Sequence, residues 1–297
     1  MLAVGGSNPW IIFNTPSNAN DFALSRANIS EGTAGFYQFS NPALIPNLGG
    51  KTFGVSYTMM SLDRSNQVIS MNIPLPPKAG VAVSMMRSGT SDIQGKDIFN
   101  NNTELFSHHE ILGIISFGVS FSKYFQGGLN IKVSNSNLDN IFGDDNEAGY
   151  SISNNGIGFD SGFLFNYSKL SLGIMMENLA SSKNWDIKIS DQGNSYEEKI
   201  PTIYKIGADY KFSDQLSLYI CKDNSLNNFL LNRYAIKINN RMDNMGLRFG
   251  ISAIAKSQLS LAMGFYYASN LFHLNYGVNF GSVNEGISHI FTWKFTL

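Results

Sequence analysis

The strongest constraint on the fold of this chain lies in residues 258–297, where apolar and polar side chains alternate along three successive stretches. The apolar positions run from Leu259 to Tyr267, from Phe272 to Phe280 and from Phe291 to Leu297. Period-two alternation indicates β-strands with one apolar and one polar face. Stretches this long exceed the roughly five or six residues of a typical soluble strand.

The two faces of these stretches differ in a way that lipid would require. Ser, Gly, Asn and Lys occupy the polar face, and aromatic residues crowd the apolar face. A soluble sandwich also alternates, but a transmembrane barrel needs apolar side chains outside and polar filling inside. We therefore predict an all-β fold, an antiparallel transmembrane β-barrel in the bacterial outer membrane, surrounded by outer-membrane lipid. The side chains predicted to face lipid are Leu259, Leu261, Phe265, Phe272, Leu274, Val278, Phe291 and Trp293.

Composition agrees with a barrel and excludes other classes. Charged residues make up 14% of the chain, against roughly 25% in soluble domains. The mean hydropathy of -0.08 is far below that of a helical membrane protein, and there is no uninterrupted apolar run of about 18 residues. A net charge of -1 gives no support for nucleic-acid binding. The single cysteine excludes a disulfide within the chain and any cysteine metal cluster.

Similar segments recur along residues 51–297 and predict a barrel of fourteen strands, an even number as in bacterial barrels. Connections of a few residues alternate with long ones at 87–109, 135–155 and 180–201. Outer-membrane barrels have short periplasmic turns and long outer loops, so both termini are expected in the periplasm. The predicted strands are 52–60, 67–75, 79–86, 110–123, 127–134, 156–167, 169–179, 202–212, 215–222, 233–239 and 245–255, followed by the three described above.

Residues 1–50 do not alternate and are rich in Asn, Ser, Ala and Pro. One interpretation is a disordered leader, as is common at termini. Trp10, Phe36 and Tyr37 argue against it, because a solvated tail is seldom so apolar. We predict an N-terminal plug segment at 1–50, folded into the mouth of a barrel at 51–297. The first residues lack the basic and apolar regions of a signal peptide, so we expect that an export signal has been removed.

Several short segments resemble a known family. Asn41, Pro42, Ala43 and Leu44, just before the first predicted strand, resemble the Asn-Pro-Ala segment of FadL-like barrels, closest to the PorV/PorQ branch associated with type IX secretion. The segments 158–162, 172–179 and 200–202 are similar to the same branch. The resemblance implies a fourteen-stranded barrel with an N-terminal plug. In this branch such barrels bind secreted cargo, whereas FadL proper carries hydrophobic molecules inward through a side opening.

Motifs for catalysis are missing from the sequence, so we expect neither an enzyme nor a cofactor. There is no Ser-His-Asp spacing, no Gly-rich phosphate loop and no HExxH. Two short runs are candidate metal sites, His108-His109-Glu110 and the acidic run 144–147. The acidic run is a candidate because Ca²⁺ prefers oxygen ligands. Neither has the spacing of a binding loop, and polar loop residues are the favoured interpretation.

Charged residues lie on the polar phase of the predicted strands and would point into the lumen. They either guide a solute or, with the plug, fill the interior as a network of paired charges. Because both signs are mixed and charges at membrane depth normally pair, the second interpretation is favoured. The principal lumen charges are Lys132, Asp160, Glu177, Lys205, Asp209, Arg248 and Lys294.

Aromatic residues on the long connections suggest a protein-binding surface, because binding energy concentrates in a few such anchors. The main hypothesis is an accessory outer-membrane component that binds a secreted protein or a translocon subunit. The alternative is a transporter of hydrophobic small molecules. A helical plug pulled away from a gap or kink in the wall, with an apolar pocket, would favour transport, and a filled lumen without a pocket would favour partner binding. The candidate anchors are Phe99, Phe106, Phe142, Tyr150, Trp185 and Tyr196.

Overall fold

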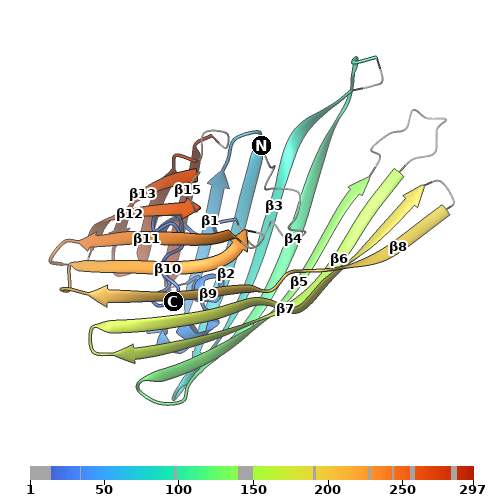
Figure 1. The fold of residues 1–297 in the computed structure, drawn as a ribbon. Helices are drawn as coiled ribbons and strands as arrows, with labels where there is room; N and C mark the ends of the chain where they lie inside the picture. Colours follow the sequence, from blue (N-terminus) through green and yellow to red (C-terminus); the bar gives the residue numbers. More distant parts are fainter. Residues whose placement is uncertain are drawn as a thin grey trace.

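The strands of this computed structural model form one closed antiparallel sheet (Figure 1). Consecutive strands pair along the chain, and β1 pairs with β15 to close the ring. β8 and β9 are two parts of one broken strand, and both pair with β7. The sheet is therefore the predicted fourteen-stranded barrel. The structure describes residues 15–33, 35–96, 99–139, 150–189, 192–226, 229–242, 244–254, 258–281 and 286–297.

The strand bounds show where the wall is regular and where it extends beyond the predicted segments. They are β1 Thr52–Met59, β2 Arg64–Leu75, β3 Ala79–Lys96, β4 Asn102–Ser120, β5 Phe125–Asp139, β6 Tyr150–Tyr167, β7 Leu170–Ile189, β8 Gln192–Lys199, β9 Ile203–Lys211, β10 Leu216–Leu226, β11 Phe229–Asn239, β12 Met245–Ile254, β13 Gln258–Ala268, β14 Phe272–Asn279 and β15 Ser288–Thr296.

The outer face of the barrel is apolar, as the alternation predicts. All eight predicted lipid-facing side chains share the outward phase of their strands, since the residues between them contact the interior or are buried. Val278 differs from the rest because only 9% of it is exposed. Exposed aromatic residues gather near the short turns, as expected at a membrane interface. They include Phe121, Phe125, Tyr167, Tyr210 and Phe212.

The three long connections predicted from the sequence are wrong as loops, because most of their residues belong to strands. β3 and β4 continue to a tip near residue 99, and β5, β6, β7 and β8 also extend well past the predicted ends. These extensions project from one end of the barrel (Figure 1). Alternation reports the contrast between a lipid face and a lumen face, and strands that leave the bilayer lose that contrast. The extensions keep their strand pairing, but their sequence lacks the alternation from which strands were predicted.

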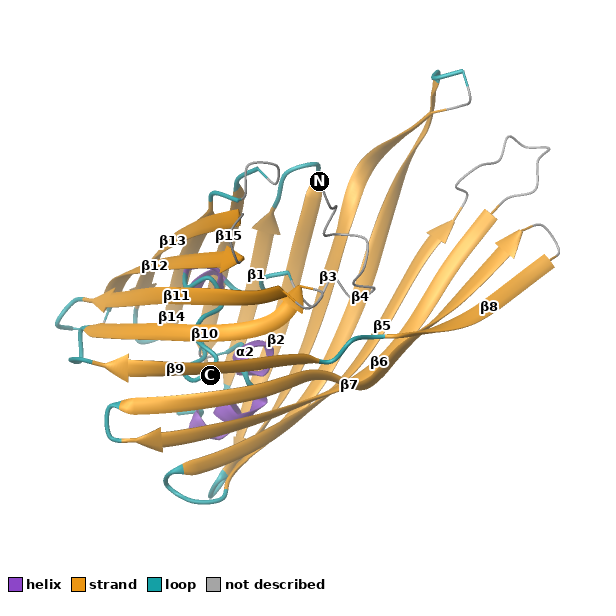
Figure 2. Ribbon diagram, viewed as in Figure 1, coloured by secondary structure: helices purple, strands orange, loops and turns teal. Residues whose placement is uncertain are grey.

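The described residues between 15 and 48 lie within the ring of strands, where Figure 2 shows the short helices in purple. This inner segment, residues 15–33 and 35–48, contains α1 Ala19–Ala23, α2 Tyr37–Ser40 and the 3-10 helix η3 Pro42–Asn47. α1 contacts β12 to β15, and η3 contacts β2 to β6. No helix within the described ranges is long and apolar enough to cross a membrane. Residues 1–14 of the predicted plug lie outside the described residues.

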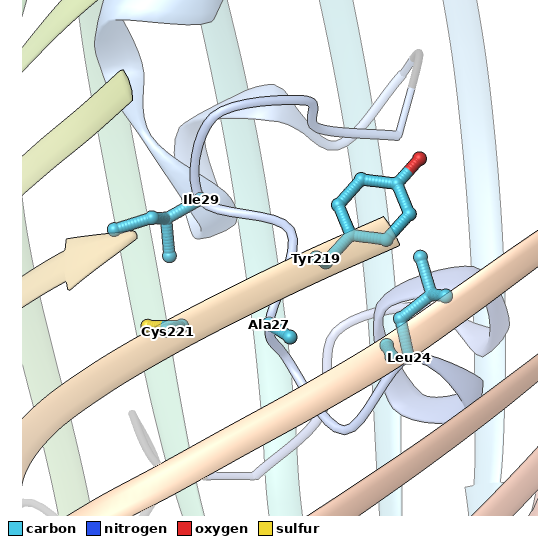
Figure 3. Packing of buried hydrophobic residues seen from close by; sticks show 6 residues of the cluster. Leu24, Ala27, Ile29, Tyr219 and Cys221 are labelled. Carbon is cyan, nitrogen blue, oxygen red and sulfur yellow. The ribbon is translucent and has the colours of Figure 1, made fainter. Parts of the chain in front are cut away.

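Apolar side chains of the inner segment pack on the wall. Leu24, Ala27 and Ile29 form a buried cluster with Tyr219 and Cys221 of β10, which Ala235 of β11 completes (Figure 3). Burial of such side chains stabilises the segment by removing apolar surface from water. The plug itself remains a proposal, and these contacts support it.

One buried carboxylate ties the inner segment together. The Asp21 side chain accepts hydrogen bonds from Asn18 Nδ2, Asn28 Nδ2 and Thr33 Oγ1, each at 2.7 Å, and from Ser40 Oγ at 2.6 Å. A carboxylate buried in this way needs such donors to offset the loss of water. Asp21 therefore links α1, the turn that follows it and α2 in one network.

A row of glycines on the inner wall seats η3. Gly80, Gly118, Gly128 and Gly162 stand directly opposite one another across β3 to β6. A Cβ atom on Gly118 would lie 2.7 Å from the Pro42 carbonyl oxygen, and one on Gly128 or Gly162 would overlap Pro42 or Asn41. Glycine is needed where another backbone approaches this closely. The predicted Asn-Pro-Ala-Leu motif thus lies against a surface built to receive it.

Candidate functional site: a break in the wall beside an apolar cavity

The wall is interrupted in the middle of β7. Asn178 and Ala180 have φ angles of 61° and 46°, a region that residues other than glycine adopt infrequently. The pairing of β7 with β6 shifts register on both sides of Phe159. Beyond this point β7 exchanges its other partner, from β9 to β8. Such bulges redirect a strand and leave backbone groups without ladder partners.

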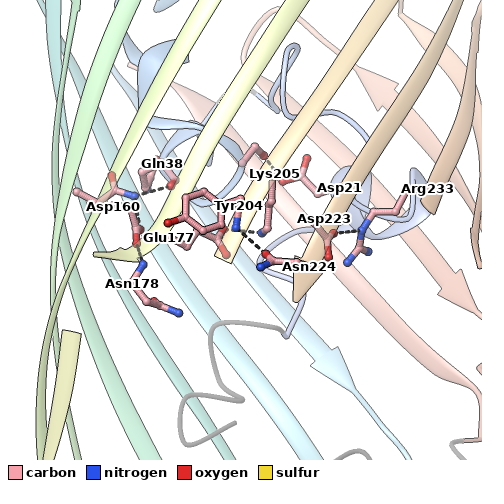
Figure 4. A network of polar contacts seen from close by, with 12 residues as sticks. Asp21, Gln38, Asp160, Glu177, Asn178, Tyr204, Lys205, Asp223, Asn224 and Arg233 are labelled. Atoms are coloured by element: carbon pink, nitrogen blue, oxygen red, sulfur yellow. Dashed lines mark hydrogen bonds and ion pairs between the residues drawn. The ribbon is translucent and has the colours of Figure 1, made fainter. Parts of the chain in front are cut away.

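Side chains replace the missing ladder bonds. The Asp160 carboxylate of β6 accepts the Asn178 backbone N–H at 3.0 Å and Asn130 Nδ2 at 2.9 Å (Figure 4). Lys132 Nζ lies 2.5 Å from Asp160 Oδ1 and donates to Asn178 Oδ1 at 2.6 Å. The ion pair is almost fully buried. Lys132 and Asp160 therefore hold the break in a defined geometry.

The broken strand β8–β9 forms the other border of the break. Ile200 N donates to Ser181 O at 2.9 Å, and Thr202 Oγ1 donates to Asn178 O at 3.3 Å. Pro201 lies between β8 and β9, where a residue without an N–H is tolerated. The three strand segments that resemble FadL-like barrels, 158–162, 172–179 and 200–202, thus meet at one place in the wall.

A small cavity of about 20 Å³ lies inside the barrel beside the break. Its apolar walls come from the inner segment and from the inward faces of β3, β4 and β7. Val68 of β2 and Phe36 belong to the same buried cluster as three of these side chains. Charged groups border the cavity only on the side of the break. Its apolar lining consists of Phe39, Met86, Leu112, Ile114 and Met175, and its polar lining of Gln38, Lys132, Asp160 and Glu177.

Sequence reasoning missed this apolar lining because it assigned every inward position to the polar phase. A signal was present in β4, where Ile111, Leu112, Ile114 and Ile115 form one nearly continuous apolar run. Such a run has apolar residues on both faces and indicates a strand buried on both sides. The adjacent Met85 and Met86 of β3 show the same loss of alternation.

The other predicted lumen charges lie inside the barrel, and several form pairs. Lys205 Nζ lies 2.5 Å from Glu177 Oε1 (Figure 4). Asp209 is fully buried on β9, and Arg248 donates to Asn20 Oδ1 at 2.9 Å. Three further ion pairs were not predicted from the sequence. They are Lys183–Glu110 at 2.6 Å, Arg233–Asp223 at 2.7 Å and Lys237–Glu31 at 2.6 Å. Lys183, for example, lay in a predicted loop, and Glu31 lies in the inner segment.

The predicted aromatic anchors that the structure describes lie on several different strands and hairpins. Trp185 and Tyr196 face each other across β7 and β8, with ring centroids 6.2 Å apart, and Trp185 Nε1 donates to Glu198 at 2.9 Å. Phe99 is 79% exposed near the tip of the β3–β4 hairpin. Phe106 lies on β4 and Tyr150 on β6. Phe142 lies outside the described residues.

The candidate metal residues are placed in different ways. Glu110 pairs with Lys183, and the acidic run 144–147 lies outside the described residues. Among the side chains that the structure describes, there is no group of three His, Cys, Asp or Glu that would hold a metal ion.

No protein-family model matches this sequence, and no curated protein matches it. Solved structures resemble it in fold. The toluene transporter TodX of Pseudomonas putida has a TM-score of 0.67 and 13% identity, covering 95% of this chain and 100% of that chain. A FadL homologue of Pseudomonas aeruginosa has a TM-score of 0.64 and 10% identity, covering 94% and 98%. The chain has the fold of these outer-membrane barrels, and nothing here supports the type IX branch.

Proposed function

We propose that this barrel carries a small hydrophobic molecule across the outer membrane through the cavity beside the β7 break. The observation that carries the proposal is the apolar lining formed by Phe39, Met86, Leu112, Ile114 and Met175. Small-molecule sites are mostly apolar and have a few polar groups that fix orientation. The fold shared with TodX, a toluene transporter, is consistent with the same class of ligand. In this proposal the long hairpins face outward and both termini lie in the periplasm.

The cavity must enlarge before it can hold a ligand. Its volume of about 20 Å³ is enough for about one water molecule. Phe39 is only partly buried and belongs to the four-residue helix α2. The N-cap residue of this helix, Phe36, makes no side-chain capping hydrogen bond. Gln38 and Phe39 of α2 line the cavity, so a shift of α2 is the simplest way to admit a ligand. The break supplies the border across which the ligand would enter.

The partner-binding role has less support. It requires aromatic side chains that are free to anchor a second protein. Trp185 and Tyr196 instead stack on each other, and Trp185 is held by Glu198. Phe99 alone is both described and highly exposed at a hairpin tip. We therefore place the transport role first.

Filling the cavity should block transport. Ile114 and Ile115 are neighbours on β4, but Ile114 is 3% exposed and lines the cavity, whereas Ile115 is 61% exposed on the outer face. We expect Ile114→Trp to reduce the uptake of radiolabelled toluene at least about fivefold, because overpacking removes the space for the ligand. The measurement is initial uptake by cells whose own hydrocarbon transporters have been deleted.

Ile115→Trp is the matched control, and uptake should stay near the wild-type rate. Equal amounts of folded barrel in the outer membrane must be verified by heat-modifiable gel mobility. Equal uptake by wild type, Ile114→Trp and a strain without the barrel would contradict the transport role. The exposed hairpins would then become the leading functional surface.

A further inference from the structure

A second cavity, of about 230 Å³, lies at the end of the barrel that carries the short turns. Its volume is several times the roughly 30 Å³ occupied by one water molecule in the liquid. Asn239 ends β11, His273 begins β14, and Lys294 stands near the end of β15, which places the cavity at this end. The inner segment closes its other side. The lining residues that matter here are Glu31, Lys237, Arg248, Tyr266, His273 and Lys294.

The charges around this cavity are unequal. Among the described residues that line it, Glu31 is the only carboxylate, and Lys237 Nζ lies 2.6 Å from Glu31 Oε1. The other Glu31 oxygen accepts a hydrogen bond from the Tyr219 hydroxyl at 2.5 Å. Glu31 is thus fully engaged by Lys237 and Tyr219. Arg248 is the direct cross-strand neighbour of Lys237, and Lys294 lies on β15, so the described lining carries more positive than negative charge.

Arg248 is fixed at the cavity wall by its neighbours. Its guanidinium donates to the amide oxygens of Asn20 at 2.9 Å and Asn239 at 2.8 Å. It also stands over the ring of Tyr266, 5.0 Å from the centroid. Contacts of this kind hold the cation in place at the cavity wall.

Lys294 is the most unusual group in the cavity. Its side chain is only 8% exposed, yet no hydrogen bond or ion pair joins its ammonium to any residue that the structure describes. The stem packs on Gly35, whose φ of 94° and missing Cβ make room for it. A buried ammonium without a counter-ion is strongly unfavourable. Its position at the cavity surface therefore calls for a negative group in the cavity.

We propose that this cavity binds a small oxyanion, either a carboxylate or a phosphate. Lys294 supplies the unpaired charge and Arg248 a pre-positioned guanidinium, and such charge-assisted hydrogen bonds are the strong ones. The site is polar and lies apart from the apolar cavity beside the break. It therefore goes beyond the transport proposal, and either can fail without the other.

The test uses the full-length barrel in a non-ionic detergent at low ionic strength. Isothermal titration with inorganic phosphate and, separately, with sodium butyrate identifies which oxyanion is bound. We expect saturable binding of at least one of them. Lys294→Met should weaken the apparent Kd about tenfold or more, which corresponds to about 1.4 kcal/mol. Lys294→Arg, which keeps the charge, should retain binding.

Lys51→Met is the matched control, because Lys51 is exposed at the same end of the barrel and does not line the cavity. Its binding should equal that of wild type. Should Lys294→Met fail to fold, Arg248→Gln takes its place with the same expected loss. The proposal is overturned if wild type shows no saturable binding of either anion up to about 10 mM. It is also overturned if a folded Lys294→Met or Arg248→Gln variant binds the anion as tightly as wild type.

Discussion

Replacing Gly128 with Leu is expected to displace the inner segment and open the barrel. A side chain at this position overlaps the Pro42–Ala43 backbone, which cannot yield as a flexible side chain would. Overpacking of this kind costs about 3 kcal/mol or more when backbone must move. The free energy of unfolding, measured by urea titration, should fall by that amount. Single-channel conductance in planar bilayers should rise well above that of wild type.

Gly113→Leu provides the control for this experiment. Gly113 lies on β4, and the nearest atom to a Cβ there is a side-chain carbon of Val133 at 3.3 Å. It has the outward phase, so a leucine would extend into lipid. Deleting residues 1–50 should raise conductance as Gly128→Leu does. Unchanged conductance in both the deletion and Gly128→Leu would show that the inner segment does not act as a plug.

Replacing Lys132 with Met should destabilise the barrel by about 3–5 kcal/mol, because it leaves the buried Asp160 carboxylate without its cation. The carboxylate also holds the Asn178 N–H at the break, so the loss is expected to disturb the bend of β7. Urea unfolding in detergent, followed by tryptophan fluorescence, measures the change.

The double variant Lys132→Met with Asp160→Asn should recover part of this loss, because it removes the uncompensated charge. Lys123→Met, on an exposed turn, should change stability by no more than about 0.5 kcal/mol. If Lys132→Met also lowered the stability by no more than about 0.5 kcal/mol, the Lys132–Asp160 pair would not hold the break together.

The barrel could be predicted because lipid imposes a strict rule on alternate positions. Leu259, Leu261 and Trp293 face outward as expected, since any polar residue there would be costly. The Asn41–Leu44 motif lies against a row of glycines that allows little variation in size, and its role in a plug stays a prediction. The predicted number of strands is correct despite the break at Pro201, because the predicted strand 202–212 corresponds to β9.

The cavity could not be predicted from the same rule. Whether an inward position is polar or apolar depends on what packs against it across the lumen. Met86 and Leu112, for example, share a buried cluster with Phe36, which is distant in the sequence. The pairing of Lys183 with Glu110 joins residues far apart in the chain. Strand alternation carries no information on such contacts. The strand extensions at 87–96, 102–109 and 180–189 were missed because apolar and polar residues do not alternate regularly along them.

In the transport proposal, a hydrophobic molecule occupies the lumen between α2 and β4. Crystals of the barrel soaked with bromobenzene test it directly, because the bromine can be located by its anomalous scattering. We expect an anomalous peak in van der Waals contact with Phe39, Met86 and Ile114, which disappears in Ile114→Trp. Bromine peaks confined to the outer, lipid-facing surface would contradict it.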